Sequence, residues 1–158
     1  MTVDVDARPV GPGDKDSLVA LARDAVALQR EKRGGVLWTR TSARAVDPEG
    51  SLADDQQRDD TRVLVGTIDG VPLGYAVAHI DVLHDGGRLA VVTDLYVDPE
   101  ARGVGIGEAL MNDLLGWATG EACFGIDSEA LPGDRHTKNF FESFGLVARS
   151  LTVHREIR

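Results

Sequence analysis

A short glycine-rich run in the middle of the chain has the residue types that bind a phosphate group. Arg102, Gly105 and Gly107 form the pattern R-x-x-G-x-G between a strand-like stretch (93–97) and a helical one. Glycine has no Cβ, so an anion can approach the main chain there, and the first amides of a helix lack internal acceptors. We therefore predict that these amides and Arg102 hold a diphosphate. The predicted contacts are Arg102, Gly103, Val104, Gly105, Ile106, Gly107 and Glu108.

Two other phosphate-binding loops do not fit this spacing. A dinucleotide fingerprint, G-x-G-x-x-G, requires a third glycine where Glu108 stands. A Walker loop requires a lysine directly after its last glycine, and none follows here. Two alternatives remain open for the run itself: a turn without a ligand, and a site for the phosphates of a nucleotide.

Hydrophobic periodicity predicts the elements that must position this loop. The first helix is expected to begin after Asp14 or Asp16 and to end at Gly34-Gly35. The last helix is expected between Asp134 and Gly145. The predicted order is a strand at 3–8, the first helix, strands at 62–68, 73–83 and 89–97, a helix at 104–119, a strand at 122–128, the last helix, and one or two strands within 146–157.

The stretch 41–61 interrupts this regular order. It is polar and acidic and has no convincing apolar stripe, so we interpret it as a mobile lid or an acceptor-side loop, with a short helix as the alternative. The remaining order of strands and helices predicts an α/β protein whose mixed sheet carries helices on both faces.

Composition limits the classes of function. The chain has 158 residues, enough for one domain over 1–158, and no apolar run approaches the roughly 18 residues of a membrane span. The formal net charge of −9 disfavours nucleic acid and anionic membranes, and it either favours a cationic acceptor or serves solubility alone. An acidic N-terminus and one cysteine, Cys123, indicate a cytoplasmic protein without an internal disulfide.

A second motif lies in the last predicted helix, where Asn139 to Gly145 read N-F-F-E-S-F-G. Together with R-x-x-G-x-G it resembles the GNAT superfamily of N-acetyltransferases, closely over 89–145 and loosely over the whole chain. The resemblance implies acetyl-CoA as the cofactor. It also implies that two neighbouring parallel strands, here 89–97 and 122–128, splay apart to receive the pantetheine arm.

The same resemblance assigns the cofactor contacts. A splayed strand has unpaired N–H and C=O groups, which the amides of the pantetheine arm can satisfy. The implied main-chain contacts are Leu95, Tyr96 and Val97, and Asn139 and Phe140 border the other side of the cofactor. The amide of Leu95 or Tyr96 is expected to polarise the thioester carbonyl.

The implied reaction is acetyl transfer to a primary amine by direct attack in a ternary complex. Thr93 and Phe141 stand where many relatives have a catalytic Glu and Tyr. The alternative is therefore a binding module for acyl-CoA without catalysis. The resemblance also implies a homodimer, with 151–154 as a strand for exchange.

Polar residues near the predicted splay are the catalytic candidates. We predict Asp94 as the base, against a structural hydrogen bond in a strand, and Tyr96 as a proton donor, against an ordinary strand aromatic. Asp127 and Glu129 are candidates for holding a cationic acceptor, or are solvated charges. His136 is a candidate proton shuttle, or a helix-start histidine without a role.

A metal site and a nucleophilic cysteine are both disfavoured. His79 and His84, with Asp81 and Asp85 nearby, fall on opposite faces of a regular strand, so we predict no metal. Cys123 is expected to be a small buried core residue.

Overall fold

The computed structural model describes residues 2–44 and 47–158. Hydrogen-bond geometry divides this part of the chain into strands, helices and two short 3₁₀ turns. Their bounds are β1 Val5–Pro9, η1 Pro12–Asp14, α1 Lys15–Arg30, α2 Gly35–Thr41, α3 Pro48–Gln57, β2 Thr61–Ile68, β3 Val71–Val82, β4 Arg88–Val97, η2 Pro99–Ala101, α4 Ile106–Gly120, β5 Gly125–Asp127 and α5 Arg135–Ser143.

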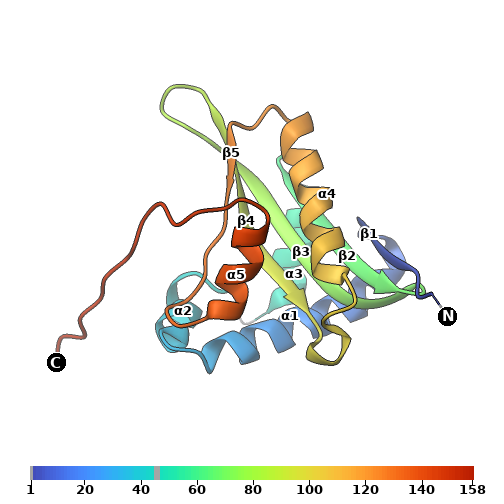
Figure 1. Cartoon of the computed structure of the whole chain (residues 1–158), viewed down its shortest axis with the longest axis horizontal. Helices are drawn as coiled ribbons and strands as arrows, with labels where there is room; N and C mark the ends of the chain where they lie inside the picture. The colour runs from blue at the N-terminus through green and yellow to red at the C-terminus, as the bar shows by residue number, and fades with distance from the viewer. Residues whose placement is uncertain (1, 45–46) are drawn as a thin grey trace.

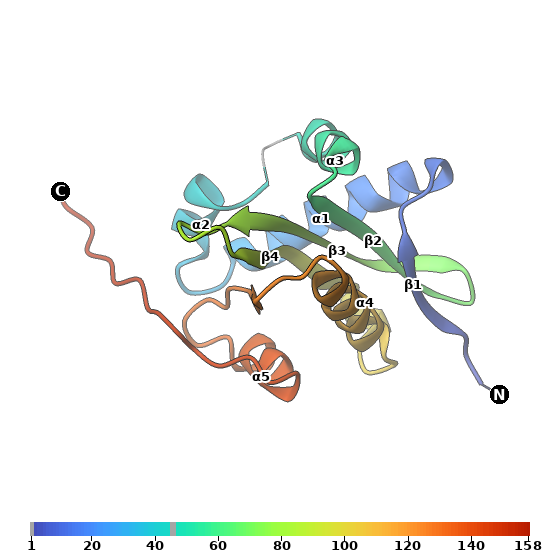
Figure 2. The same ribbon diagram turned by 90° about the horizontal axis from the view of Figure 1, so that it is seen from above.

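One mixed sheet with the strand order β1-β2-β3-β4-β5 forms the centre of the molecule (Figure 1). The first four strands pair antiparallel, and β4 pairs parallel with β5. Helices α1, α2 and α3 lie on one side of this sheet, and α4 and α5 lie on the other (Figure 2). The predicted fold class is confirmed.

Each face of the sheet packs against its own helices. Alternation along β3 sends Tyr75 and Val77 towards α1 and α3, whereas Ala76 and Ala78 face α4. On the α4 side, Leu110 and its neighbours in that helix are fully buried. The two cores hold the central strands rigidly, so the strand edges between them are fixed in position.

The parallel pairing of β4 and β5 is short. It joins Leu89 to Gly125 and ends at Val91 and Asp127. Among the described residues, β4 has no strand neighbour on that side beyond Val91, although it stays paired with β3 up to Val97. The edge of β4 from Thr93 to Val97 is therefore open.

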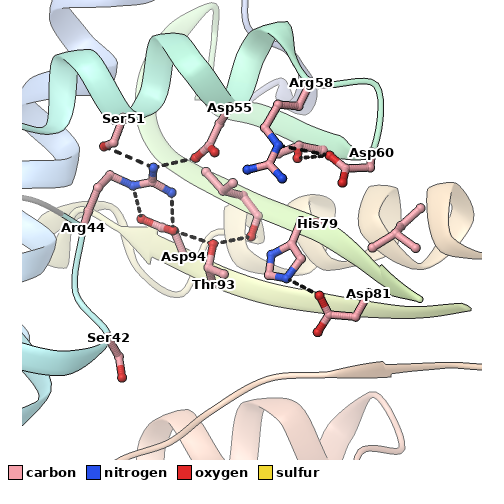
Figure 3. Close-up of a pocket in the computed structure, with 13 residues that line it drawn as sticks. Ser42, Arg44, Ser51, Asp55, Arg58, Asp60, His79, Asp81, Thr93 and Asp94 are labelled. Carbon is pink, nitrogen blue, oxygen red and sulfur yellow. Dashed lines mark hydrogen bonds and ion pairs between the residues drawn. The ribbon is translucent and has the colours of Figure 1, made fainter. Parts of the chain in front are cut away.

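A β-bulge lies just after the point where β4 and β5 separate. In the register of β3 and β4, Val77 is opposite Asp94 and Ala78 is opposite Val92, so Thr93 is the extra residue. The bulge re-aims two consecutive polar side chains, those of Thr93 and Asp94, towards the same cavity (Figure 3).

Some expected elements differ in the structure. Residues 41–61 are not mainly a loop, because α3, the short helix of the alternative, occupies 48–57 and its Leu52 is only 1% exposed. The short helix α2 was not predicted. Residues 146–158 form no strand, and the apolar side chains of this arm are largely exposed. The strand predicted at 122–128 shortens to three residues, which leaves the arm little edge to pair with.

Within residues 2–44 and 47–158, no helix has both the length and the apolar content to cross a membrane.

Candidate active site

The turn before α4 presents a continuous row of unpaired main-chain amides. Gly103 and Gly105 have φ angles of +82° and +108°, a left-handed conformation that favours glycine. In the described part of the chain, no amide from Gly103 to Glu108 donates to a protein acceptor. The first bond of the helix runs from the Ala109 amide to the Gly105 carbonyl, at 3.0 Å. The row therefore offers free donors of the kind that bind an anion, at the residues where the sequence predicts the diphosphate.

Arg102 folds back along β4 instead of extending away from it. Its Nε donates to the Val97 carbonyl at 3.1 Å, and its guanidinium carbon lies 6.0 Å from the centre of the Tyr96 ring. These two contacts hold a positive charge between the open edge of β4 and the glycine turn.

Leu95, Tyr96 and Val97 lie on the open edge of β4, where the sequence placed the main-chain contacts. Leu95 and Val97 pack against the α4 core, whereas Tyr96 belongs to the opposite core and is 9% exposed. Burial, and then the charges of Asp24 and Asp98, raise the pKa of the Tyr96 phenol above its ordinary value. The phenol therefore keeps its proton at neutral pH.

Helix α5 lies beside the amide row, and it carries Asn139 and Phe140, the residues predicted to border the cofactor. A Cβ on Gly107 would lie 3.4 Å from the Phe140 ring, which places this ring against the first turn of α4. Asn139 is exposed on α5, and the Asp134 side chain caps this helix by accepting from the Thr137 amide at 3.2 Å.

Asp94 is the centre of a buried hydrogen-bond network (Figure 3). Its Oδ1 accepts from Nη2 of Arg44 at 2.6 Å and from Thr93 Oγ1 at 2.7 Å. Its Oδ2 accepts from Nε of Arg44 at 3.0 Å and from the Tyr75 hydroxyl at 2.7 Å. A proton on either oxygen would displace one of these donors, so the geometry favours a structural role for this carboxylate over that of a base.

The partners of Asp94 are fixed as donors by their protonation states. Burial, and then the neighbouring Asp94 carboxylate, raise the pKa of Tyr75 well above its ordinary value. Burial alone would lower the pKa of Arg44, but hydrogen bonds and charge from Asp94 and Asp55 outweigh it and raise the pKa. Arg44 also donates to Asp55 at 2.5 Å and thereby connects α3 to β4.

A cavity of about 360 Å³ lies between α3 and the strands, directly over the bulge (Figure 3). Its walls carry carboxylates, two arginines and one histidine, so it is polar and acidic in character. The lining residues are Ser42, Arg44, Ser51, Asp55, Arg58, Asp60, Thr61, Val77, His79, Ile80, Asp81, Thr93 and Asp94.

The sequence did not predict most of this cavity. Arg44 and Asp55 lie in the stretch interpreted as a loop, and they carried no signal of their contact with β4. Tyr75 did carry a signal, because its position alternates with Val77 and His79 on one face of a buried strand.

Other candidate residues lie apart from the cavity. The Asp127 carboxylate is paired with Arg149, whose Nε lies 2.9 Å from Oδ2. Glu129 and His136 are exposed. Cys123 is only partly buried, contrary to the prediction of a buried core residue, because the chain between α4 and β5 runs at the surface.

The histidines do not form a metal site. His79 bonds Asp81 within β3, whereas His84 lies exposed in the following turn. Across residues 2–44 and 47–158, no group of three or more His, Cys, Asp and Glu side chains is arranged to hold an ion.

Together, the open strand edge and the row of free amides have the geometry expected of a class of protein that binds an extended ligand ending in a diphosphate. The sequence model of the acetyltransferase (GNAT) family matches residues 32–146. The chain belongs to the GNAT acetyltransferase family. The prediction of an acetyltransferase that uses acetyl-CoA is thereby confirmed at the level of the family.

Solved structures support the same fold. A Bacillus halodurans protein matches with a TM-score of 0.80 and 19% identity, over 96% of this chain and 99% of its own. A putative acetyltransferase from Agrobacterium tumefaciens matches with a TM-score of 0.72 and 19% identity, over 96% of this chain and 99% of its own. An aminoglycoside acetyltransferase, AAC(6')-Iy, was solved with a bisubstrate analogue. It matches with a TM-score of 0.75 and 17% identity, over 98% of this chain and 99% of its own. No curated protein matches the sequence significantly.

The residues of this chain fit acetyl-CoA. The amides from Gly103 to Glu108 offer donors to a diphosphate, and the edge of β4 offers N–H and C=O groups to an arm that contains amides. The cavity meets β4 at the bulge, at the end of that edge away from the amide row.

Proposed function

We propose that the protein transfers the acetyl group of acetyl-CoA to a primary amine of a small cationic molecule by direct attack in a ternary complex. The observation that carries the proposal is that β4 leads into the amide row at its C-terminal end and borders the acidic cavity at its central bulge. A donor held on the first can therefore meet an acceptor held in the second.

Each part of the chain has a distinct task in this proposal. The amides from Gly103 to Glu108 hold the diphosphate, and Arg102 adds charge. The main chain of Leu95, Tyr96 and Val97 aligns the pantetheine arm, and Asn139 and Phe140 bound its other side. Bound acetyl-CoA supplies an acetyl thioester, whose carbonyl an amide of Leu95 or Tyr96 polarises.

The character of the acceptor follows from charge. The whole chain carries a formal net charge of −9, and four aspartates line the cavity beside two arginines and a histidine. An alkylammonium group is attracted to such a site. Two of the similar structures are aminoglycoside acetyltransferases, one of them solved with sisomicin, which supports an acceptor with several amino groups.

A thiol-release assay tests the proposal. Purified protein and acetyl-CoA are incubated with a panel of alkylamines, polyamines and aminoglycosides, and free coenzyme A and the acetylated product are measured together. We expect thiol release with amines of this panel, in equal amounts with acetylated product, and none without an amine.

The second candidate, a binding module without transfer, is favoured by Thr93 and Phe141 at the usual positions of the catalytic Glu and Tyr. Tight binding of coenzyme A in calorimetry, with no thiol released by any amine, is the outcome that supports the module. Competition by ATP for the same site would instead support a nucleotide-phosphate site.

The proposal includes self-association through the C-terminal arm. Residues 151–154 alternate apolar and polar side chains, and Leu151 and Val153 are 89% and 91% exposed. Such a strand can pair with a second copy of the chain.

A further inference from the structure

We propose that His79, oriented by Asp81, is the base that removes a proton from the acceptor's ammonium group. The inference rests on the proposed function, since it concerns the acceptor in the same cavity. His79 is the one histidine among the described residues that line this cavity. An imidazole is suited to proton transfer near neutral pH.

His79 lies beside the point where the sheet opens. In the register of the strands, His79 of β3 is opposite Val91 of β4, and Val91 is opposite Asp127 of β5. This row is the last one that spans all three strands before β4 and β5 separate. The histidine therefore adjoins the part of β4 where the proposed cofactor arm ends.

The contact with Asp81 leaves one ring nitrogen available. His79 and Asp81 share the face of β3 that lines the cavity, and Nε2 lies 3.0 Å from Oδ1 of Asp81. We assign the tautomer in which Nε2–H donates to Asp81, so that Nδ1 carries the free lone pair. The other ring nitrogen is turned from Asp81 towards the cavity (Figure 3).

The carboxylates that face the cavity are engaged with cations. Asp94 and Asp55 both bind Arg44, whose side chain is 8% exposed. Asp60, at the start of β2, lies 3.4 Å from Arg58. Asp81 is engaged with the histidine itself. Together with the Tyr75 phenol, these groups are the charged and titratable neighbours of His79 on β2, β3, β4 and α3. Among them, only the His79 imidazole has a nitrogen that is free to accept a proton.

The proton balance is simple. One N–H bond of the ammonium breaks, its proton binds Nδ1, and the nitrogen lone pair becomes free to form the amide bond. The imidazolium charge is balanced by Asp81, and after the reaction the proton on Nδ1 passes to water, which restores the starting tautomer; the His79 side chain is 34% exposed. The neutral amine's further proton ends on the departing thiolate, which becomes the thiol. One acetyl transfer from an ammonium ion thus releases one proton.

Two amines of nearly equal size test the role of His79 as a base. Ethylamine is strongly basic and enters as an ammonium ion, whereas 2,2,2-trifluoroethylamine is weakly basic and is already neutral at pH 8. We expect His79→Gln to lower kcat/KM for ethylamine about 100-fold or more and to change kcat/KM for trifluoroethylamine by less than about threefold. Equal losses with both amines, or no loss with either, would overturn the inference.

Added imidazole provides a second measure that a structural role would not affect. In His79→Ala, imidazole in solution should restore ethylamine turnover in proportion to its concentration, and failure to restore it counts against the inference. Asp81→Asn, which removes the orienting carboxylate and its charge but keeps the imidazole, should give a smaller loss that is again confined to ethylamine. His84→Gln, in the exposed turn after β3, is the matched control and should retain wild-type rates.

Two readouts do not require turnover. Calorimetry should give His79→Gln the same Kd for coenzyme A as the wild type. In NMR spectra of the free protein, ethylammonium chloride should shift the ring signals of His79 and leave those of His84 and His154 in place. If no amine on the panel makes the wild type release thiol, the proposed function itself is overturned. If the wild type turns over but the His79 variants lose the same activity with both amines, only this inference is overturned.

Discussion

Arg44 brings a full positive charge into a site where its side chain is only 8% exposed. Such a charge is tolerated because Asp94 and Asp55 bind it from β4 and α3, and each contact is a short charge-assisted hydrogen bond. Asp94 is thereby committed to holding these elements together. At the scale of single residues, Asp94 is thus a structural carboxylate, whereas His79, the proposed base, keeps one ring nitrogen without a partner among the described residues.

The Asp94→Asn variant distinguishes these roles. Loss of one carboxylate leaves Arg44 with Asp55 alone, so we expect the free energy of unfolding to fall by about 3 kcal/mol in urea denaturation. We expect slower acetyl transfer, a nearly unchanged Kd for coenzyme A, and an acid limb of the pH–rate profile that stays at its wild-type pH. Loss of that limb would return the role of base to Asp94. Asp60→Asn, in the exposed pair with Arg58, should cost less than about 1 kcal/mol.

Gly105 is the residue at which the cofactor site is most sensitive to a side chain. Gly105→Val should lower the affinity for coenzyme A at least about tenfold in calorimetry, because a branched side chain would stand beside the free amides. At a φ of +108° the valine also strains the backbone, so some stability is lost. Gly86→Val, at a φ of +87° in the turn between β3 and β4, controls for that strain. Equal affinities for the two variants would contradict the assigned site.

At the scale of elements, the sequence predicted those strands and helices whose apolar residues repeat at a regular spacing. The strands β2, β3 and β4 and the helix α4 were predicted to within a few residues, because their apolar positions repeat regularly over long stretches. The glycines of the turn before α4 were informative because glycine readily adopts the positive φ angles that Gly103 and Gly105 have there.

Helix α3 shows why the remaining elements were missed. Its sequence is rich in Asp and Gln, and one residue, Leu52, provides most of its buried contact. Tertiary contacts stabilise this helix, including the bond from Arg44 to Asp55, and no local pattern reports them. The cavity is built from these contacts and was therefore not predictable, whereas the glycine turn and the edge of β4 could be placed from local patterns.

Helix α5 depends on a cap that also forms an ion pair. Asp134 accepts from the Thr137 amide and lies 2.7 Å from Nζ of Lys32. Burial alone would raise the pKa of Asp134, but the bonds from Lys32 and Thr137 outweigh it and lower the pKa below its ordinary value of 3.8. A lowered folded-state pKa stabilises the protein above the unfolded value, and this contribution is lost as the pH falls through the folded value.

We therefore expect Asp134→Ala to lower the free energy of unfolding by about 1 kcal/mol at pH 7, measured in urea. The difference from the wild type should shrink as the pH falls below about 3.8. Lys32→Gln, which keeps the cap and removes the ion pair, should cost less at pH 7. A difference that is constant from pH 7 to pH 3 would contradict this account.

At the scale of the whole molecule, the C-terminal arm remains to be explained. It extends away from the sheet with Leu151, Val153 and Ile157 about nine-tenths exposed (Figure 2). Odd-numbered apolar positions fall on one face of an extended strand, so all three can be covered at once. Burial of each such side chain stabilises by about 2 kcal/mol.

This arm predicts a dimer that depends on those side chains. Light scattering of the full chain at micromolar concentration should give twice the monomer mass, and removal of residues 151–158 should give the monomer, with the pair of Arg149 and Asp127 kept in place. Leu151→Asp should weaken association because it places a charge on the face to be covered. Val71→Asp, at an exposed valine at the start of β3, should leave the mass unchanged. A full chain that stays monomeric under these conditions would show that the arm is not a contact between copies.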